Sequence, residues 1–112
     1  MLGLAAFALE RWHEARSELL AFRRLAGRRT HDHLIADCYT TEGNPGRALE
    51  ILDDLAPADL PARAWSDVAL ARARALAANG KPDLALGVLR TTRAADPAAR
   101  ARLDEAIAAL QR

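Results

Sequence analysis

The chain of 112 residues is poor in several residue types, and each shortage excludes a class of protein. Its single cysteine cannot form an internal disulfide, so nothing ties the chain to an oxidising compartment, and we expect a cytoplasmic location. Only 4% of the residues are aromatic, and valine, isoleucine and threonine are sparse, which argues against a β-sandwich or barrel. The net charge of +1 provides no overall field that would attract nucleic acid.

The chain also has no long hydrophobic run. The longest apolar stretch, from Leu2 to Leu9, is far shorter than the roughly 20 residues that a membrane-spanning helix requires. This stretch has neither the basic flank nor the cleavage site of a signal peptide. We therefore expect neither a membrane protein nor a secreted one.

The residues that are abundant favour helices. Apolar residues make up 51% of the chain and charged residues 28%, and alanine and leucine together account for about two-fifths of it. The apolar periodicity predicts one all-α domain with helices that begin near Leu2, Trp12, His31, Pro45, Ala62, Pro82 and Pro97. Glycines are expected to end three of these helices, at Gly27, Gly43 and Gly80. Three polar residues have the position of N-caps: Thr30, Asn44 and Asp96.

A short segment recurs within the sequence. Gly43-Asn44-Pro45, followed by Ala48-Leu49, matches Gly80-Lys81-Pro82, followed by Ala85-Leu86, at an offset of 37 residues. The segment around Ala15 fits the same frame 33 residues before Ala48, without the glycine. Each unit thus reads as a helix, a tight turn and a second helix. Because one helix hairpin cannot cover both its faces, such units are expected to stack.

Three sets of residues recur in register: Leu2-Gly3, Ala15, Leu19 and Phe22; Ile35-Ala36, Tyr39, Gly43, Ala48 and Leu52; and Ala73, Leu76, Gly80, Ala85, Leu89 and Pro97. In these positions the chain resembles the tetratricopeptide repeat (TPR) family. The resemblance implies a single domain over residues 1–112, a right-handed α-α superhelix of about three helix hairpins, with units at about 1–29, 30–60 and 61–97 and a capping helix at 97–111. The run from His33 to Cys38, followed by Gly43-Asn44-Pro45, resembles bacterial, actinobacterial-type repeat proteins of unassigned activity.

The first unit is shorter than this pattern implies, since about seven residues that would precede Leu2-Gly3 are missing. Two interpretations remain open for its apolar residues Leu4 and Phe7. Either the chain is a piece of a longer array, or these side chains contact another chain. The second interpretation predicts a self-associating assembly module as the alternative function.

The resemblance implies that the first helix of each unit lines a concave groove, which holds a segment of a partner protein without a cofactor. Carried over by register, the groove residues are His33, Asp37, Thr40, Thr41, Asp67, Leu70 and Arg74, with Leu4, Phe7, Ala8, Ala77 and Ala78. The spacing of His33, Asp37 and Thr41 places them on one helix face in any case. A solvated outer face is the alternative interpretation of these positions.

Other chemistries have weaker patterns. His31, His33, Asp37 and Cys38 are potential metal ligands. His33 and Asp37 converge on one helix face, but His31 and Cys38 point elsewhere, so we expect no metal site. The basic cluster of Arg23, Arg24, Arg28 and Arg29 complements a helix C-terminus and lacks the stacking aromatics of a nucleic-acid site. The sequence has no phosphate-binding loop and no nucleophile paired with a base, so we expect a protein that is not an enzyme.

Overall fold

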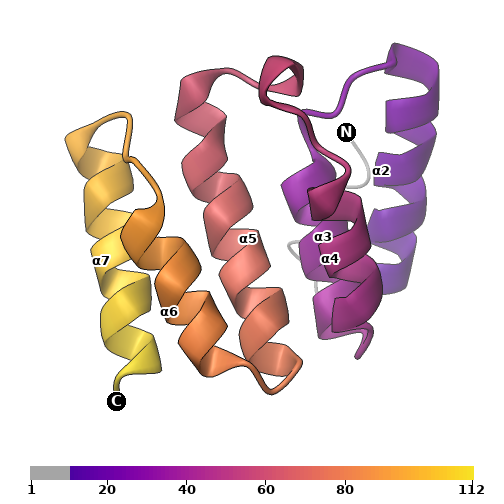
Figure 1. Cartoon of the computed structure of the whole chain (residues 1–112). Coiled ribbons are helices and arrows are strands. Elements are labelled where there is room, and N and C mark those ends of the chain that lie inside the picture. Colours follow the sequence, from indigo (N-terminus) through magenta and orange to yellow (C-terminus); the bar gives the residue numbers. More distant parts are fainter. Residues whose placement is uncertain (1–10) are drawn as a thin grey trace.

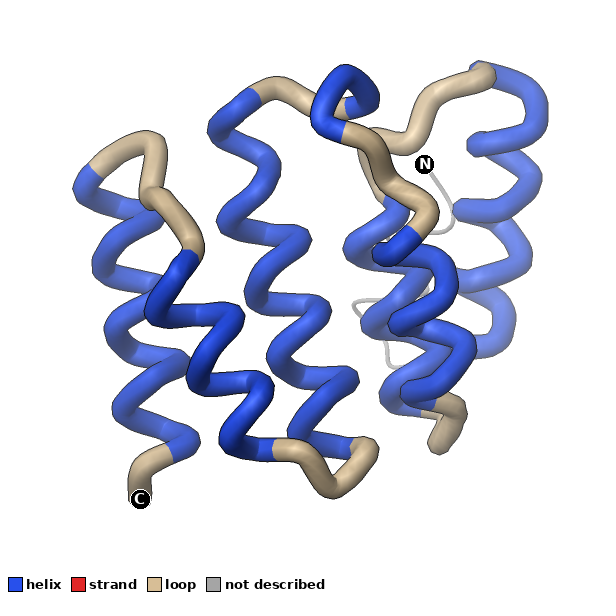
Figure 2. The backbone as a smooth tube through the Cα atoms, in the orientation of Figure 1, coloured by secondary structure: helices blue, strands red, loops and turns tan. Residues whose placement is uncertain are grey.

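The computed structural model describes residues 11–112, and this part of the chain contains helices and no strand (Figure 2). The α-helices are α2 (Trp12–Ala26), α3 (Asp32–Thr41), α4 (Pro45–Asp53), α5 (Trp65–Ala78), α6 (Pro82–Thr91) and α7 (Pro97–Leu110), with two 3-10 turns, η1 (Pro57–Asp59) and η2 (Ala62–Ala64). The prediction of an all-α fold is therefore confirmed for these residues. The helix expected to begin near Leu2 lies outside the described residues. None of the described helices has the length and apolar character needed to cross a bilayer.

The helices follow one another in space as they do in sequence (Figure 1). Helix α3 packs against α2, α4 and α5, and α5 packs in turn against α6 and α7. Consequently α2 and α7 lie at opposite ends of the molecule (Figure 1). The helices that begin the second and third sequence units, α3 and α5, contact each other directly, as do α5 and α7.

The two turns that the sequence aligns have the same hydrogen bonds. In the first turn, the backbone N–H groups of Gly43 and Asn44 donate to the carbonyl oxygens of Thr40 and Tyr39, at 3.1 and 2.8 Å. In the second turn, 37 positions later, the N–H groups of Gly80 and Lys81 donate to the carbonyl oxygens of Ala77 and Leu76, at 3.1 and 2.9 Å. Gly43 and Gly80 have left-handed backbones, with φ of 89° and 76°, which is why glycine is needed there.

Two of the predicted N-caps are confirmed. The side chain of Asn44 accepts a hydrogen bond from the backbone N–H of Arg47 at 3.4 Å, and that of Asp96 accepts one from Ala99 at 2.7 Å. Each cap is followed by a proline at the first helical position, whose missing N–H leaves nothing unsatisfied. Gly27 also ends α2 in the left-handed conformation, as expected.

The predicted cap of α3 and the predicted start of α5 are wrong. Thr30 does not cap α3: it lies in a turn, and His31 occupies the N-cap position without a side-chain hydrogen bond. Helix α5 begins at Trp65, three residues after the expected start. The buried Leu60 and the extended Pro61 hold the chain in a loop, so it enters α5 through the tight turn η2.

The buried apolar residues form three clusters, and each cluster takes its side chains from three consecutive helices, with Leu60 of the loop before α5 added to the second. The cluster of α2, α3 and α4 contains Ala15, Leu19, Ile35, Cys38 and Ile51. The cluster of α3, α4 and α5 contains Ala36, Ala48, Leu52, Leu60, Val68, Ala71 and Ala75. The cluster of α5, α6 and α7 contains Ala69, Ala73, Ala85, Leu89 and Leu103. No pair of adjacent described helices therefore encloses a core without a third.

Equivalent positions of the sequence units have the same burial. Each second helix has one alanine and, four residues later, one leucine that are completely inaccessible to solvent: Ala15 and Leu19, Ala48 and Leu52, and Ala85 and Leu89. The alanine allows a neighbouring helix to approach closely, and the leucine, one turn later on the same face, fills the interior. The sequence offset thus corresponds to an equivalent packing position.

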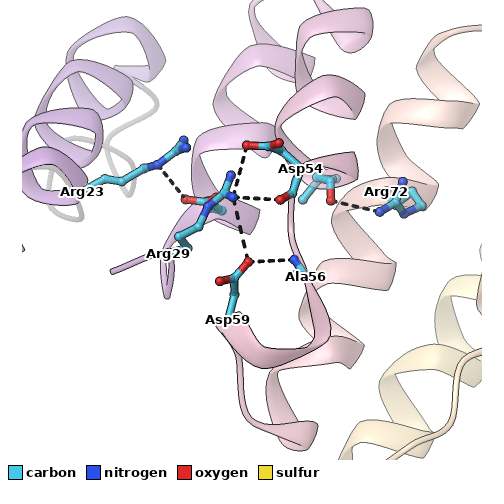
Figure 3. Close-up of polar contacts among 8 residues, drawn as sticks. Arg23, Arg29, Asp54, Ala56, Asp59 and Arg72 are labelled. Carbon is cyan, nitrogen blue, oxygen red and sulfur yellow. Dashed lines mark hydrogen bonds and ion pairs between the residues drawn. The ribbon is translucent and has the colours of Figure 1, made fainter. Parts of the chain in front are cut away.

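Arg29 joins the loops at one end of the helices, and Figure 3 shows its guanidinium beside Asp54 and Asp59. Asp32 is 1% exposed and accepts a hydrogen bond from Nε of Arg29 at 2.8 Å, with Arg23 Nε at 3.8 Å. Arg29 also donates to the carbonyl oxygen of Asp54 at 2.9 Å, and its Nη1 lies 3.9 Å from the carboxylate of Asp59. Burial raises the pKa of Asp32, while the two arginines oppose that change. Arg29 therefore fastens the α2–α3 turn to the end of α4 and to η1.

Two alanine substitutions of glycine are expected to change stability in opposite directions. Gly80→Ala should lower the free energy of unfolding by about 1–2 kcal/mol, because φ of 76° is unfavourable for any residue with a Cβ. Gly87→Ala, in the exposed middle of α6, should raise it by about 0.5–1 kcal/mol. A Cβ meets no atom within 4 Å at either position, so packing does not contribute to the difference. Urea unfolding followed by circular dichroism measures both, and equal effects would contradict the turn geometry.

Candidate functional site

An open hollow of about 520 Å³ lies between α3 and α5. We call it the α3–α5 hollow; its lining residues are Trp12, His33, Leu34, Asp37, Thr40, Thr41, Asp67, Leu70, Arg74 and Arg102. This set includes seven of the predicted groove residues, four from α3 and three from α5. Ala77 lines a neighbouring hollow, and Ala78 is exposed at the end of α5 and lines neither hollow. Leu4, Phe7 and Ala8 lie outside the described residues, so self-association through Leu4 and Phe7 remains a prediction.

Helix geometry explains why these residues gather in one place. On α3, His33, Asp37 and Thr40 are separated by four and three positions, which places them on one face. On α5, Asp67, Leu70 and Arg74 have steps of three and four. Because α3 and α5 pack side by side, the two faces form opposite walls of one hollow.

One ion pair crosses the hollow from wall to wall. Arg74 on α5 donates from Nε to Oδ1 of Asp37 at 2.9 Å and from Nη2 to Oδ2 at 2.6 Å. The two residues are 37 positions apart, so they are equivalent positions of successive sequence units. The side chain of Asp37 is 12% exposed and that of Arg74 is 54% exposed, so the guanidinium covers the carboxylate. This bidentate pair fixes α5 relative to α3.

A second ion pair continues the same pattern toward the C-terminus. Nη1 of Arg102 on α7 donates to Oδ1 of Asp67 on α5 at 3.0 Å, and again the arginine is the more exposed partner, 51% against 35%. Sequence reasoning missed Arg102, because it treated α7 only as a cap. The available signal was the spacing of 35 residues from Asp67, close to the offset that separates Asp37 from Arg74.

The remaining polar groups of the hollow are neutral. Burial lowers the pKa of His33, against the opposing influence of Asp67 and Asp37, so its ring is uncharged at neutral pH. The hydroxyl of Thr40 is buried and has no hydrogen-bond partner within the described part of the chain. The hollow therefore combines two internally neutralised ion pairs with the uncharged ring of His33 and the hydroxyl groups of Thr40 and Thr41.

A smaller apolar hollow of about 170 Å³ adjoins the first one, and sequence reasoning did not identify it. We call it the α5–α7 notch; its lining residues are Leu70, Ala73, Arg74, Ala77, Leu89, Ala106, Ala109 and Leu110. Leu70 and Arg74 line both hollows, so the two are continuous along α5. The signal in the sequence was the run of alanines on α5 and α7, but only the packing of α7 shows which alanines face each other.

The residues considered for metal binding are distributed over different environments. The ring of His31 lies 5.2 Å from that of Phe22, His33 lines the α3–α5 hollow, and Cys38 is completely buried in the core of α2, α3 and α4. Within residues 11–112, no three histidine, cysteine, aspartate or glutamate side chains are arranged to hold a metal ion.

The arginine cluster at the end of α2 is divided by the structure. Arg23 and Arg29 point to the buried Asp32, whereas Arg24 and Arg28 are exposed. A separate polar hollow of about 490 Å³ contains Arg23 and Arg29, but acidic side chains line it as well: Glu50, Asp53 and Asp54. Positive charge is thus compensated on this surface.

Cys38 is expected to be unreactive in the folded protein. Burial, together with the negative charges of Glu42 and Asp37, raises the pKa of its thiol to about 12. At pH 8 a disulfide reagent such as DTNB should therefore label no thiol in the native chain and one thiol per chain in guanidinium chloride. An Ala108→Cys variant, with its new thiol on the exposed surface of α7, should show one fast-reacting thiol when native and a second only on unfolding. Rapid labelling of the native parent chain would contradict this packing.

The Asp37–Arg74 pair should stabilise the fold more than an ordinary surface pair does. In a double-mutant cycle with Asp37→Asn and Arg74→Met, we expect a coupling of about 1–2 kcal/mol in the free energy of unfolding, because two charge-assisted hydrogen bonds join a buried carboxylate to another helix. The exposed pair of Arg100 and Asp104 within α7 is the control, with at most about 0.5 kcal/mol. Urea unfolding of both cycles gives the comparison, and equal couplings would argue against a bridging role.

The chain was also compared with known proteins. It matches no protein-family model, and no characterised protein or solved structure shows significant similarity to it.

Proposed function

We propose that the chain is a TPR-like, right-handed superhelix that is not catalytic and that binds a segment of a partner protein in the α3–α5 hollow. The observation that supports this most directly is the gathering of His33, Asp37, Thr40, Thr41, Asp67, Leu70 and Arg74 around one hollow. These residues were selected by repeat register alone. The stack of helices, each in contact with its neighbours along the chain, is the packing that such a superhelix requires.

The charge arrangement favours a polypeptide over a nucleic acid. The two arginines that line the hollow, Arg74 and Arg102, are each paired with a carboxylate. The hollow therefore has no excess of positive charge, whereas neutralisation of several phosphates needs unpaired cations. No aromatic side chain other than Trp12 lines the described hollow, which gives few platforms for stacked bases.

The shape favours a chain segment over a small molecule. The α3–α5 hollow and the α5–α7 notch share Leu70 and Arg74, so together they form one surface along three helices. Small-molecule sites are typically enclosed and mostly apolar. This surface is open and begins polar near α3, which fits an extended or helical segment that lies across the helices.

Selection of peptides tests the proposal and requires no identified partner. A phage-displayed library of random peptides about twelve residues long would be selected on the whole chain, and the affinities of enriched peptides measured by calorimetry. We expect micromolar binding that Thr41→Trp weakens by about tenfold or more, because this exposed position lines the hollow and the indole fills it.

Ala108→Trp is the matched control, since Ala108 is exposed on α7 and lines neither of the two hollows. It should leave the affinity unchanged. If no peptide is enriched, or if every enriched peptide binds Thr41→Trp as well as the parent chain, the proposed binding site is wrong.

A further inference from the structure

We infer that the α5–α7 notch receives one large apolar side chain of the bound segment, and that acidic residues flank this side chain in the partner. This inference rests on the proposed function and specifies the class of peptide: an acidic segment with a single phenylalanine-sized or leucine-sized anchor. The size of the notch, its lining and the exposure of the neighbouring arginines each contribute to the argument.

The notch has the size of one large side chain. Its volume is about 170 Å³, and an apolar cavity of about 150 Å³ is known to hold a benzene ring. Four of its eight lining residues are alanines, Ala73 and Ala77 on α5 and Ala106 and Ala109 on α7, and their small side chains leave this space open beside the leucines that line it. An apolar group that entered the notch would remove this apolar surface from water, and that change is the driving force for binding.

The lining of the notch has a single residue that could form a hydrogen bond through its side chain. Arg74 is its only polar lining residue and lies at the boundary with the α3–α5 hollow. A polar anchor would lose its hydrogen bonds to water without gaining partners at the bottom of the notch. The anchor should therefore be apolar, and the polar neighbours of the anchor should meet Arg74.

The ion pairs present their positive side to the partner. Arg74 and Arg102 are 54% and 51% exposed, whereas the carboxylates beneath them, on Asp37 and Asp67, are 12% and 35% exposed. Hydrogen bonds to Asp37 engage Nε and Nη2 of Arg74, which leaves the N–H groups of Nη1 for another acceptor. Hydrogen-bond donors thus cover this surface while the acceptors lie underneath. The pairs carry no net charge, so a carboxylate of the partner is favoured over an ammonium group by the remaining Nη1 donors of Arg74, which a carboxylate can accept from and an ammonium group cannot.

Three capped tripeptides test the anchor and the charge separately. The probes are N-acetyl-Glu-Phe-Glu-amide, N-acetyl-Glu-Ala-Glu-amide and N-acetyl-Lys-Phe-Lys-amide, titrated into the whole chain with 13C-labelled alanine methyl groups. The first should shift the signals of Ala73, Ala77 and Ala106 with a millimolar dissociation constant that weakens with added salt. The second lacks the anchor and the third has the opposite charge, and each should bind at least about tenfold more weakly.

Two variants show whether the notch itself is the site. Ala109→Phe fills the notch from an exposed position on α7, so the fold should persist while the shifts disappear. Ala108→Phe, one residue away and outside the notch, should behave as the parent chain does, and circular dichroism checks the folding of both. Binding of the first tripeptide that Ala109→Phe leaves intact would overturn the assignment of the notch. Equal binding of the acidic and basic tripeptides would overturn the acidic flank.

The two experiments distinguish a failure of the notch assignment from a failure of the proposed function. Library peptides whose affinity falls in Thr41→Trp but not in Ala109→Phe would support the α3–α5 hollow as the binding site and would overturn the assignment of the notch. The opposite result is also possible. If Ala109→Phe abolishes tripeptide binding while library peptides bind Thr41→Trp as tightly as the parent chain, the notch is supported and the α3–α5 hollow is overturned as the binding site.

Discussion

Each helix pair in the described chain needs a third helix to bury its apolar side chains, and the rest of the structure depends on this constraint. The three core clusters overlap along the chain, so α3 contributes to the first two and α5 to the last two. The separation of α3 from α5 is therefore set by side chains that both helices share with α4. The hollow between them follows from that separation, as does the notch between α5 and α7.

Ion pairs add further connections between the helices that the apolar clusters hold together. Two aspartates on α3 and α5 each pair with an arginine on the next of these helices, and in both cases the arginine lies outermost. Elsewhere in the structure, Arg29 joins the buried Asp32 to the end of α4. The charged residues thus connect successive helices to one another, and the face that remains open combines exposed donors with an apolar notch.

The sequence predicted most helix ends because they depend on local chemistry. Glycine at a left-handed position ends α2 and follows α3 and α5, and Asn44 and Asp96 cap their own first turns. Thr30 was the wrong cap, since α3 begins at Asp32 with His31 in the N-cap position. Asp37 and Arg74 were placed on one face by spacing, but their pairing required α3 and α5 in contact. Arg102 and the notch were missed because both depend on how α7 packs.

The sequence by itself determined that the described chain is helical, where its turns lie and which side chains share a face, because these properties arise within a few residues of backbone. The distances between helices, the choice of partner for each charge and the notch between α5 and α7 were decided only by the tertiary structure. Small side chains permit a range of helix separations. The separation that occurs is selected by all the contacts together, and the shape of the binding surface is selected with it.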